Sequence, residues 1–341
     1  MVTLSVLDQS PIRKGGTAAQ ALRETIELAR LTDRLGFHRY WLAEHHGSGG
    51  LACSSPEVMI GQVAANTSGI RVGSGGVMLT HYSALKVAEN FRMLEALFPG
   101  RIDLGVGRAP GSDTRTDQAL AVGPGKLPLE HYPDQLMDLY GYLSDDLPPD
   151  HPFRSVRATP AVETCPELWM LGSSDASARY AAELGWAFCF AHFINPEGGE
   201  RWVRWYQQNY QASPLSPTPR ASIGVSVTCA ETDEEAERLS WSRWYSRIAG
   251  NRGARGGGIP SPEEAMAFDY TEPEREYIEF MKTRSVFGGP AKVKRMLLEL
   301  AERFNVDEVV AVTITYDFEA RKHSYELLAE AFGLTPRAQA G

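Results

Sequence analysis

An acid and two histidines stand where an aromatic and apolar run of the sequence ends. The run at residues 39–43 is typical of a buried strand, and Glu44, His45 and His46 follow it directly, before a glycine-rich loop. Such groups can transfer protons, and in a parallel α/β barrel the carboxyl ends of the strands carry the chemistry. Each histidine taken alone is explained as well by a structural role. All three residues are therefore candidate catalytic groups.

The same three residues do not predict a metal site. Side chains alternate along a strand, so Glu44 and His45 point to opposite sides if the strand extends that far. No second cluster in the sequence supplies further His or Cys ligands at a familiar zinc spacing. We therefore expect no metal.

A glycine-rich strand at residues 72–78 is a second candidate for ligand contact. Its three glycines cost backbone entropy and pack no side chain. One explanation is a flat ligand that lies against bare backbone at Ser74, Gly75 and Gly76. The other is a bulge or a tight barrel corner. The polar residues that follow, Thr80–Ser83, favour the ligand.

An arginine follows the next strand end. Arg108 comes after the strand at 102–107, and a guanidinium makes paired, charge-assisted hydrogen bonds to a phosphate or carboxylate. A surface ion pair is the alternative. The surrounding glycines nearly match a dinucleotide-binding fingerprint, but Pro110 stands in place of the third glycine, so a Rossmann site is not favoured.

A glycine and three serines lead from another strand into a helix. Gly172, Ser173, Ser174 and Ser177 follow the strand at 168–171, where free N–H groups, the helix dipole and hydroxyls suit a phosphate. A simple serine cap at Ser174 is the alternative. The sequence lacks the G-x-S-x-G signature, which argues against a serine hydrolase. His192, near the end of the strand at 187–193, could line the same barrel end, although a core or surface position is favoured.

Strands and helices alternate along the chain, and this alternation predicts the fold. The eight expected strands lie at 4–7, 39–43, 70–79, 102–107, 168–171, 187–193, 222–229 and 308–313. A helix follows each strand, as in a (β/α)8 TIM barrel, and a doubly wound open sheet is the alternative. We expect one domain over residues 1–341, with two insertions. The first, after the fourth strand (108–164), contains a glycine- and proline-rich segment at 122–125, and the second, before the eighth strand (248–289), is expected to be irregular.

Composition narrows the class of protein. The chain has 341 residues, a net charge of −9 and 43% hydrophobic residues, without a basic patch, so nucleic acid and anionic membranes are poor partners. No apolar run approaches the ~20 residues of a membrane span, and the N-terminus lacks the pattern of a signal peptide. The four cysteines are far apart, which favours buried thiols over disulfides. These features predict a cytoplasmic protein.

Several of these motifs together resemble the bacterial luciferase-like, flavin-dependent oxidoreductases, and most closely the single-gene luciferase-like monooxygenases. The stretches that carry the resemblance are 4–11, 39–46, 70–79, 99–111 and 171–174, with Val286–Pro290 near the C-terminus. The resemblance implies a (β/α)8 barrel that binds reduced FMN at its carboxyl mouth. It also implies a mobile lid near the glycines at 250–258.

The resemblance also assigns roles to individual residues. It places His45 beside the flavin as the first histidine of the family's Glu-His-His, and it makes Arg108 a ligand of the FMN phosphate. Ser173, Ser174 and Ser177 fall on the family's phosphate loop, and the strand that carries Ser74, Gly75 and Gly76 lies under the flavin ring. Gly107 stands where true luciferases have a reactive cysteine, so light emission is not implied.

The resulting expectation is an FMN-dependent monooxygenase that acts on a small organic substrate with dioxygen. No second nucleotide-binding signature is visible, so a separate flavin reductase is expected to supply reduced FMN. The resemblance further implies a homodimer. Two alternatives remain: an oxidoreductase that transfers hydride with a deazaflavin, and a non-catalytic flavin-binding protein.

Overall fold

A computed structural model describes residues 2–108, 114–120, 129–253 and 256–337. Parts of three predicted features lie outside these ranges. They are the end of the 99–111 stretch with Pro110, the glycine- and proline-rich segment at 122–125, and residues 254–255 of the glycine-rich segment before the eighth strand.

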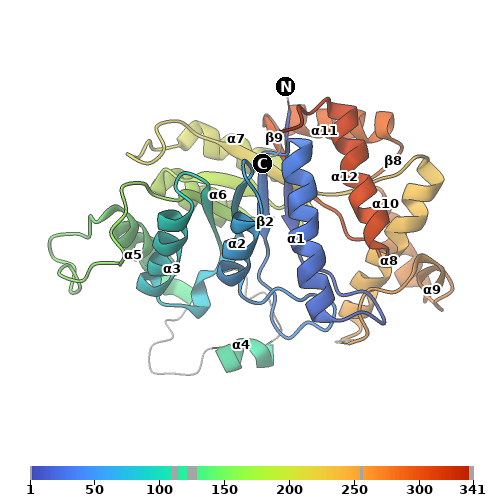
Figure 1. Cartoon of the computed structure of the whole chain (residues 1–341), viewed down its shortest axis with the longest axis horizontal. Coiled ribbons are helices and arrows are strands. Elements are labelled where there is room, and N and C mark those ends of the chain that lie inside the picture. The colour runs from blue at the N-terminus through green and yellow to red at the C-terminus, as the bar shows by residue number, and fades with distance from the viewer. Residues whose placement is uncertain (1, 109–113, 121–128, 254–255, 338–341) are drawn as a thin grey trace.

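Eight parallel strands close into a barrel, which confirms the predicted (β/α)8 fold (Figure 1). Every neighbouring pair is parallel, β1 pairs with both β2 and β9, and β6 pairs with β7 to close the ring. The barrel strands are β1 (Thr3–Asp8), β2 (Arg39–Leu42), β3 (Arg71–Met78), β4 (Ile102–Gly107), β5 (Glu167–Gly172), β6 (Ala187–Phe190), β7 (Ala221–Cys229) and β9 (Glu308–Val312).

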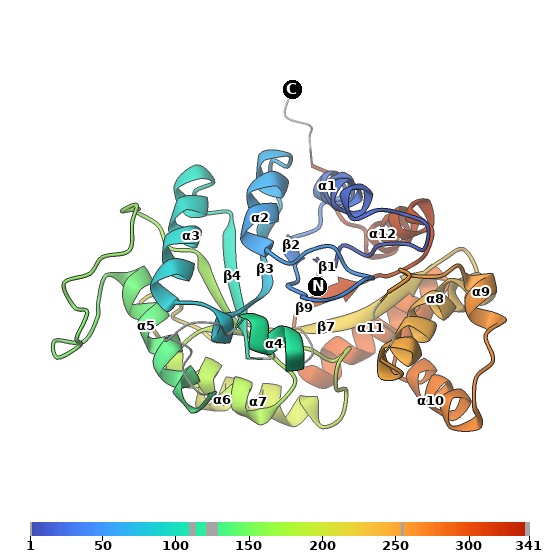
Figure 2. The ribbon, with the colours of Figure 1, turned by 90° about the horizontal axis from the view of Figure 1, so that it is seen from below.

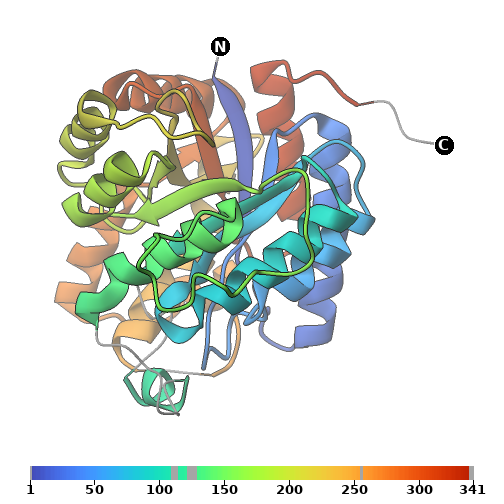
Figure 3. The ribbon, with the colours of Figure 1, turned by 90° about the vertical axis from the view of Figure 1, so that its left-hand side faces the viewer.

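Helices surround the barrel, and several begin and end at the signals that the sequence carries (Figure 3). They are α1 (Ala18–Leu35), α2 (Pro56–Ala65), α3 (Ala84–Leu97), α5 (Tyr132–Ser144), α6 (Asp175–Leu184), α7 (Gly199–Asn209), α8 (Asp233–Asn251), α11 (Pro290–Phe304) and α12 (Phe318–Phe332). Thr17 caps α1 by accepting from the Gln20 N–H, and Gly36 ends it at φ 93°. None of the helices described is long and apolar enough to cross a membrane.

The two insertions contain more regular structure than the sequence predicted. The first carries α4 (Thr114–Leu120) and a short 3-10 turn, η2 (Leu129–His131), before α5; another such turn, η1 (Leu79–His81), follows β3. The second was expected to be irregular, and that expectation is wrong. It contains α9 (Pro262–Met266), α10 (Glu272–Lys282) and a short strand, β8 (Val286–Gly288), which pairs with the end of β7.

Capping signals explain the unexpected helices. Ser261 accepts a hydrogen bond from the Glu264 N–H at the start of α9. Thr271 and Glu274 form a capping box that begins α10. The glycines at 250–258 precede these capping residues, and they led to the prediction of an irregular insertion.

The hydrophobic core has two layers, one between strands and helices and one inside the barrel. The inner layer includes Leu7, Trp41 and Trp169, and the two indole rings meet edge to face at 5.1 Å. Glycines in β3 and β4 leave room for these side chains: a Cβ on Gly75 would lie 2.6 Å from Leu7 Cδ1, and one on Gly105 would lie 2.3 Å from a backbone oxygen.

A buried charge network fills the amino end of the barrel. Arg39 donates to Asp103 at 2.7 Å and to Glu308 at 2.6 Å, and Arg71 lies 2.6 Å from the other Asp103 oxygen. Burial alone would raise the pKa of Asp103, but Arg39 and Arg71 hold it below its usual value. Since these charges satisfy one another, the amino end is a structural floor and ligands have access from the carboxyl end.

Candidate active site at the carboxyl mouth of the barrel

Glu44 ties the ends of two neighbouring strands together. β2 ends at Leu42, and two residues later the Glu44 carboxylate is fully buried. Its Oε1 accepts from the Tyr82 hydroxyl at 2.7 Å and lies 2.6 Å from His46 Nε2, while its Oε2 accepts from the Met78 N–H at 2.9 Å. Since the Met78 N–H and the Tyr82 hydroxyl also donate to this carboxyl group, we assign it as the acceptor of a hydrogen on His46 Nε2. Glu44 therefore orients His46.

His46 and the insertion after β4 meet at the mouth. The rings of His46 and His81 lie 5.9 Å apart, edge to face, and His81 Nδ1 lies 3.6 Å from a carboxylate oxygen of Asp117 on α4. A Cβ on Gly47 would lie 2.7 Å from the hydroxyl of Thr116, so α4 rests against the loop that carries the histidines. Figure 2 is a view onto this end of the barrel and shows α4 in front of the strands.

His45 is neutral, and one of its ring nitrogens, Nδ1, is buried without a hydrogen-bond partner among the described residues. Burial, and then the neighbouring His46, lower the pKa of His45 to about 4. Since His45 lines a cavity as a neutral imidazole, it can accept a hydrogen bond or a proton from a ligand there.

Both histidines line one large cavity of about 1040 Å³ at the carboxyl ends of the strands. Its floor includes Gln9 after β1, Ser226 on β7 and Ile314 after β9. Helix α8 and the second insertion form its wall, with aromatic side chains on α8 and α10 and on the segment between them: Trp244, Tyr245, Phe268, Tyr277 and Phe280. This is the size and polarity of a small-molecule site.

His192 lies in the same cavity. The sequence favoured a core or surface position, and the side chain is indeed buried, with its ring 5.7 Å from that of Phe304. Burial lowers the pKa of His192 to about 4, and Nδ1 has no partner within the part of the chain that the structure describes. His192 is thus a second neutral imidazole on the cavity wall.

The glycine-rich strand contains the bulge that was one of its two explanations. The pairing of β3 with β4 shifts between Gly75 and Val77. The Ser74 hydroxyl is buried and bridges to β4: it donates to the Gly105 carbonyl at 2.8 Å and accepts from the Gly105 N–H at 3.1 Å. Packing therefore accounts for these residues without a ligand, and the contact of Ser74, Gly75 and Gly76 with a flavin stays a prediction.

The residues predicted to hold a phosphate lie at the ends of β4 and β5, away from the lining of the large cavity. Arg108 follows β4 and is exposed. Burial raises the pKa of the Tyr132 phenol, and the charge of Arg108 opposes this increase with a smaller effect. Ser174 precedes α6, and its hydroxyl makes no cap bond to the helix.

The serines and Gly172 pack tightly at this helix start. Ser177 donates to the Ser174 carbonyl at 3.0 Å, and a Cβ on Gly172 would lie 2.1 Å from the Ser177 hydroxyl. The close approach explains the glycine. The N–H groups at the start of α6 and the Ser174 hydroxyl are not used in capping, which leaves them available to an anion.

Sequence reasoning missed Tyr82 and the aromatic wall. Tyr82 stands 38 residues from Glu44, so only the pairing of β2 with β3 brings them together. The aromatic residues of α8 and α10 follow helical spacing and resemble ordinary core positions.

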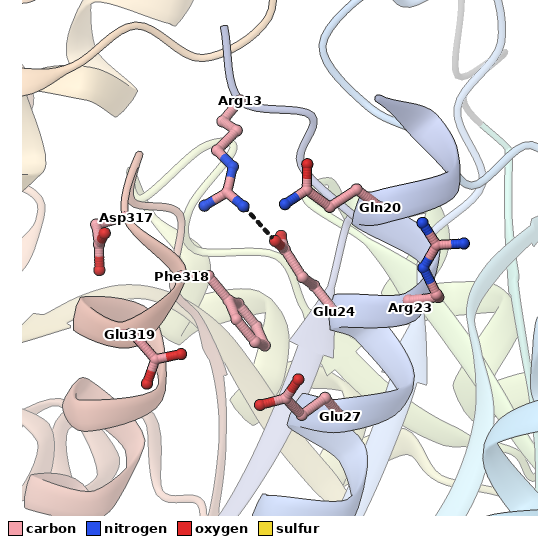
Figure 4. Close-up of a pocket in the computed structure, with 8 residues that line it drawn as sticks. All are labelled: Arg13, Gln20, Arg23, Glu24, Glu27, Asp317, Phe318 and Glu319. Atoms are coloured by element: carbon pink, nitrogen blue, oxygen red, sulfur yellow. Dashed lines mark hydrogen bonds and ion pairs between the residues drawn. The ribbon is translucent and has the colours of Figure 1, made fainter. Parts of the chain in front are cut away.

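A smaller hollow of about 380 Å³ lies on the outside of the barrel, between α1 and α12 (Figure 4). Arg13 and Glu24 form an ion pair across it at 2.8 Å, and Glu27, Asp317 and Glu319 surround it. None of the candidate catalytic residues lines this hollow. Among the described residues, no group of three or more His, Cys, Asp or Glu side chains could hold a metal ion.

Known proteins match the chain over nearly its whole length. Residues 2–307 match the family model described as luciferase-like monooxygenase. N-acetyl-S-alkylcysteine monooxygenase of Bacillus subtilis (strain 168) is 39% identical, over 97% of this chain and 98% of that protein. The crystal structure of apo-MsnO8 is 39% identical and has a TM-score of 0.89, covering 99% of this chain and 100% of that one.

A more distant structure shares the fold. The oxygenating constituent of 3,6-diketocamphane monooxygenase from Pseudomonas putida, solved with FMN, has a TM-score of 0.72 at 19% identity, covering 99% of each chain. The family match and the relatives agree with the barrel fold. The chain therefore belongs to the luciferase-like monooxygenase family.

Proposed function

We propose that this protein is a monooxygenase that uses reduced FMN and dioxygen on a small organic substrate. The observation that carries the proposal is the large cavity at the strand ends, which is lined by His45 as a neutral imidazole. The family match supports the reaction class. The FMN complex of the distant barrel and the flavin-dependent character of the family support the cofactor.

The residues at the mouth fit a flavin phosphate. Arg108 offers a guanidinium after β4, and the start of α6 offers backbone N–H groups with the hydroxyls of Ser173 and Ser174. Ser177 lies buried beneath them and supports the turn.

Reduced FMN, when bound, supplies the two electrons that let one oxygen atom enter the substrate while the other leaves as water. The chain supplies the remaining functions. His45 can accept a proton, because it is neutral above pH ~4. Glu44 fixes the orientation of His46, and α4 with the aromatic wall limits the access of water to the mouth.

A separate reductase is proposed to deliver the reduced flavin. The sequence offers one candidate phosphate site and no dinucleotide fingerprint, so the barrel itself has no evident place for a nicotinamide donor. Activity should therefore depend on added flavin reductase or on chemically reduced FMN.

Anaerobic titration separates this proposal from hydride transfer with a deazaflavin. The wild-type protein should bind reduced FMN more tightly than either riboflavin or a reduced deazaflavin. Arg108→Ala should lower the affinity for reduced FMN about tenfold or more and leave that for riboflavin within twofold, because only FMN carries the phosphate. The exposed variant Arg295→Gln, on α11, is the charge-matched control. Binding of the deazaflavin alone would overturn the choice of FMN.

A further inference from the structure

Two arginines on the cavity wall have no acidic partner. Arg243 and Arg247 stand one turn apart on α8 and line the cavity. In the part of the chain that the structure describes, neither guanidinium makes a hydrogen bond or an ion pair. Arg243 is partly buried, whereas Arg247 is exposed. A partly buried charge without a partner is costly, so its place on a cavity wall points to a ligand.

The lining of the cavity as a whole is also positively charged. Lys14, Arg243, Arg247 and Arg284 are the cations among the described lining residues, and Glu264 is the one carboxylate. Glu264 is paired with Lys14 at 2.9 Å, and Arg284 with Glu197 at 2.7 Å. The two arginines of α8 thus remain as an uncompensated pair in a protein whose net charge is −9.

The two arginines also repel each other. Like charges four residues apart on a helix are destabilising. Burial, and then the charge of Arg247, lower the pKa of Arg243 to about 10. An anion placed between them would relieve both effects, and a guanidinium binds a carboxylate through two parallel hydrogen bonds.

We propose that Arg243, assisted by Arg247, binds a carboxylate group of the substrate. This inference rests on the proposed function and names the substrate class: a small acid with an apolar body. The apolar part would lie between the aromatic side chains of the wall, such as Trp244 and Phe280, and the reacting atom would point to the strand ends and His45. Arg243 would thereby determine specificity and orient the substrate.

The flavin phosphate is the other anion that the enzyme would bind, and the residues proposed to hold it are different from those that would hold the substrate carboxylate. Arg108 and the start of α6 follow β4 and β5, whereas α8 follows β7. None of the residues assigned to the phosphate lines the cavity beside Arg243. The experiment must nevertheless distinguish these two sources of anion.

Binding measured without flavin or oxygen tests the proposal apart from turnover. The probes are N-acetyl-S-benzylcysteine, chosen after the substrate class in the name of the Bacillus relative, and its carboxamide, which has the same shape without the charge. Calorimetric titration of the full-length protein should give a dissociation constant at least tenfold lower for the acid than for the amide. Arg243→Gln should reduce this preference to less than threefold, with the affinity for the amide unchanged.

Further variants keep the test decisive. Arg243→Lys retains a charge and should keep part of the preference, whereas Arg247→Gln should lose less of it than Arg243→Gln, because Arg247 is exposed. Arg295→Gln on α11 removes a surface charge far from the cavity and should change nothing. Arg243→Gln should also bind reduced FMN and riboflavin with the wild-type ratio.

Three results would overturn the assignment. The first is equal binding of acid and amide by the wild-type protein, and the second is an undiminished preference for the acid in Arg243→Gln. The third is loss of the FMN-over-riboflavin ratio in that variant, which would place the flavin phosphate at Arg243. Failure of monooxygenation would be seen separately, as absence of turnover with an intact preference for the acid.

Discussion

At the scale of single residues, the site is organised by one buried carboxylate. Glu44 accepts hydrogen bonds from a side chain of its own loop, from the backbone at the end of β3 and from a tyrosine that follows. Three hydrogen-bond partners satisfy its two oxygens, as a fully buried polar group requires. His45, its neighbour in sequence, makes none of these contacts and stays neutral. Because successive side chains of an extended chain point to opposite sides, the adjacent residues Glu44 and His45 have different surroundings.

Replacing Glu44 by glutamine tests the orienting role. The two oxygens of Glu44 are surrounded by donors, and the amide of glutamine replaces one of these oxygens by an NH₂ group, which is itself a donor. Either the Met78 N–H or the donors from Tyr82 and His46 then lose their acceptor. We expect kcat to fall about 10- to 100-fold, with the affinity for reduced FMN within twofold. Steady-state kinetics and anaerobic titration measure the two effects.

Glu57→Gln is the matched control for this variant. Glu57 lies near enough to Glu44 for the two charges to interact, but it is not the hydrogen-bond partner of His46. Its replacement should leave kcat within about threefold. An unchanged kcat in Glu44→Gln would remove the carboxylate from the mechanism.

The sequence predicted the candidate residues better than their contacts. Glu44, His45 and His46 stood out because reactive groups followed an apolar strand, and all three lie at the mouth. The partner Tyr82 and the unpaired Arg243 could not be predicted. Tyr82 depends on strand pairing across 38 residues, and Arg243 resembles the charged positions of any surface helix until its surroundings are known.

At the scale of elements, β3 and β4 are shaped by the residues that they pack against. Glycines in these two strands let the inner faces accept Trp41, Leu7 and Leu171 at short range. Gly105 and Gly107 of β4 differ greatly in the space available for an added Cβ atom. That difference gives a direct test of the packing.

Gly105→Ala should destabilise the barrel strongly. Its Cβ would lie 2.3 Å from the Ser74 carbonyl oxygen, which is backbone and cannot turn away. We expect a loss of about 3 kcal/mol or more in the free energy of unfolding, measured by urea denaturation. Gly107→Ala, in the same strand, meets only Met78 Sδ at 3.8 Å and should cost less than about 1 kcal/mol. Equal losses in the two variants would contradict this account of the strands.

Elements were predictable where local signals agreed with long-range packing. The eight barrel strands and the ends of α1 followed from apolar runs and capping residues. Three helices of the insertions, α4, α9 and α10, were missed, because they are short and depend on tertiary contacts for stability. Their capping residues were present in the sequence but stood beside glycines and prolines.

At the scale of the whole molecule, buried neutral histidines make the fold sensitive to acid. The pKa values of His45 and His192 are lowered by burial to about 4, below the ~6.5 of an unfolded histidine. Between these values the unfolded chain binds more protons than the folded one. Stability is therefore unaffected above pH ~6.5 and falls as the pH decreases from there towards 4.

His192→Gln should reduce this acid sensitivity. Near pH ~4.5 the shifted pKa of His192 accounts for about 2 kcal/mol of lost stability relative to pH ~7, and the variant should lack that part. Urea unfolding at the two pH values measures it. His323→Gln is the control, because His323 is exposed, its carboxylate partners raise its pKa, and its removal should not lessen the loss in acid. Identical pH dependence in wild type and His192→Gln would contradict the buried neutral state.

The most direct test of the central claim is the fate of dioxygen in a single turnover. The protein is loaded anaerobically with reduced FMN and N-acetyl-S-benzylcysteine, exposed to ¹⁸O₂, and the organic product is analysed by mass spectrometry. A monooxygenase puts one ¹⁸O atom into the product, and His45→Ala should lower the yield while reduced FMN still binds. A product without label, or turnover that needs a deazaflavin and no oxygen, would contradict the account.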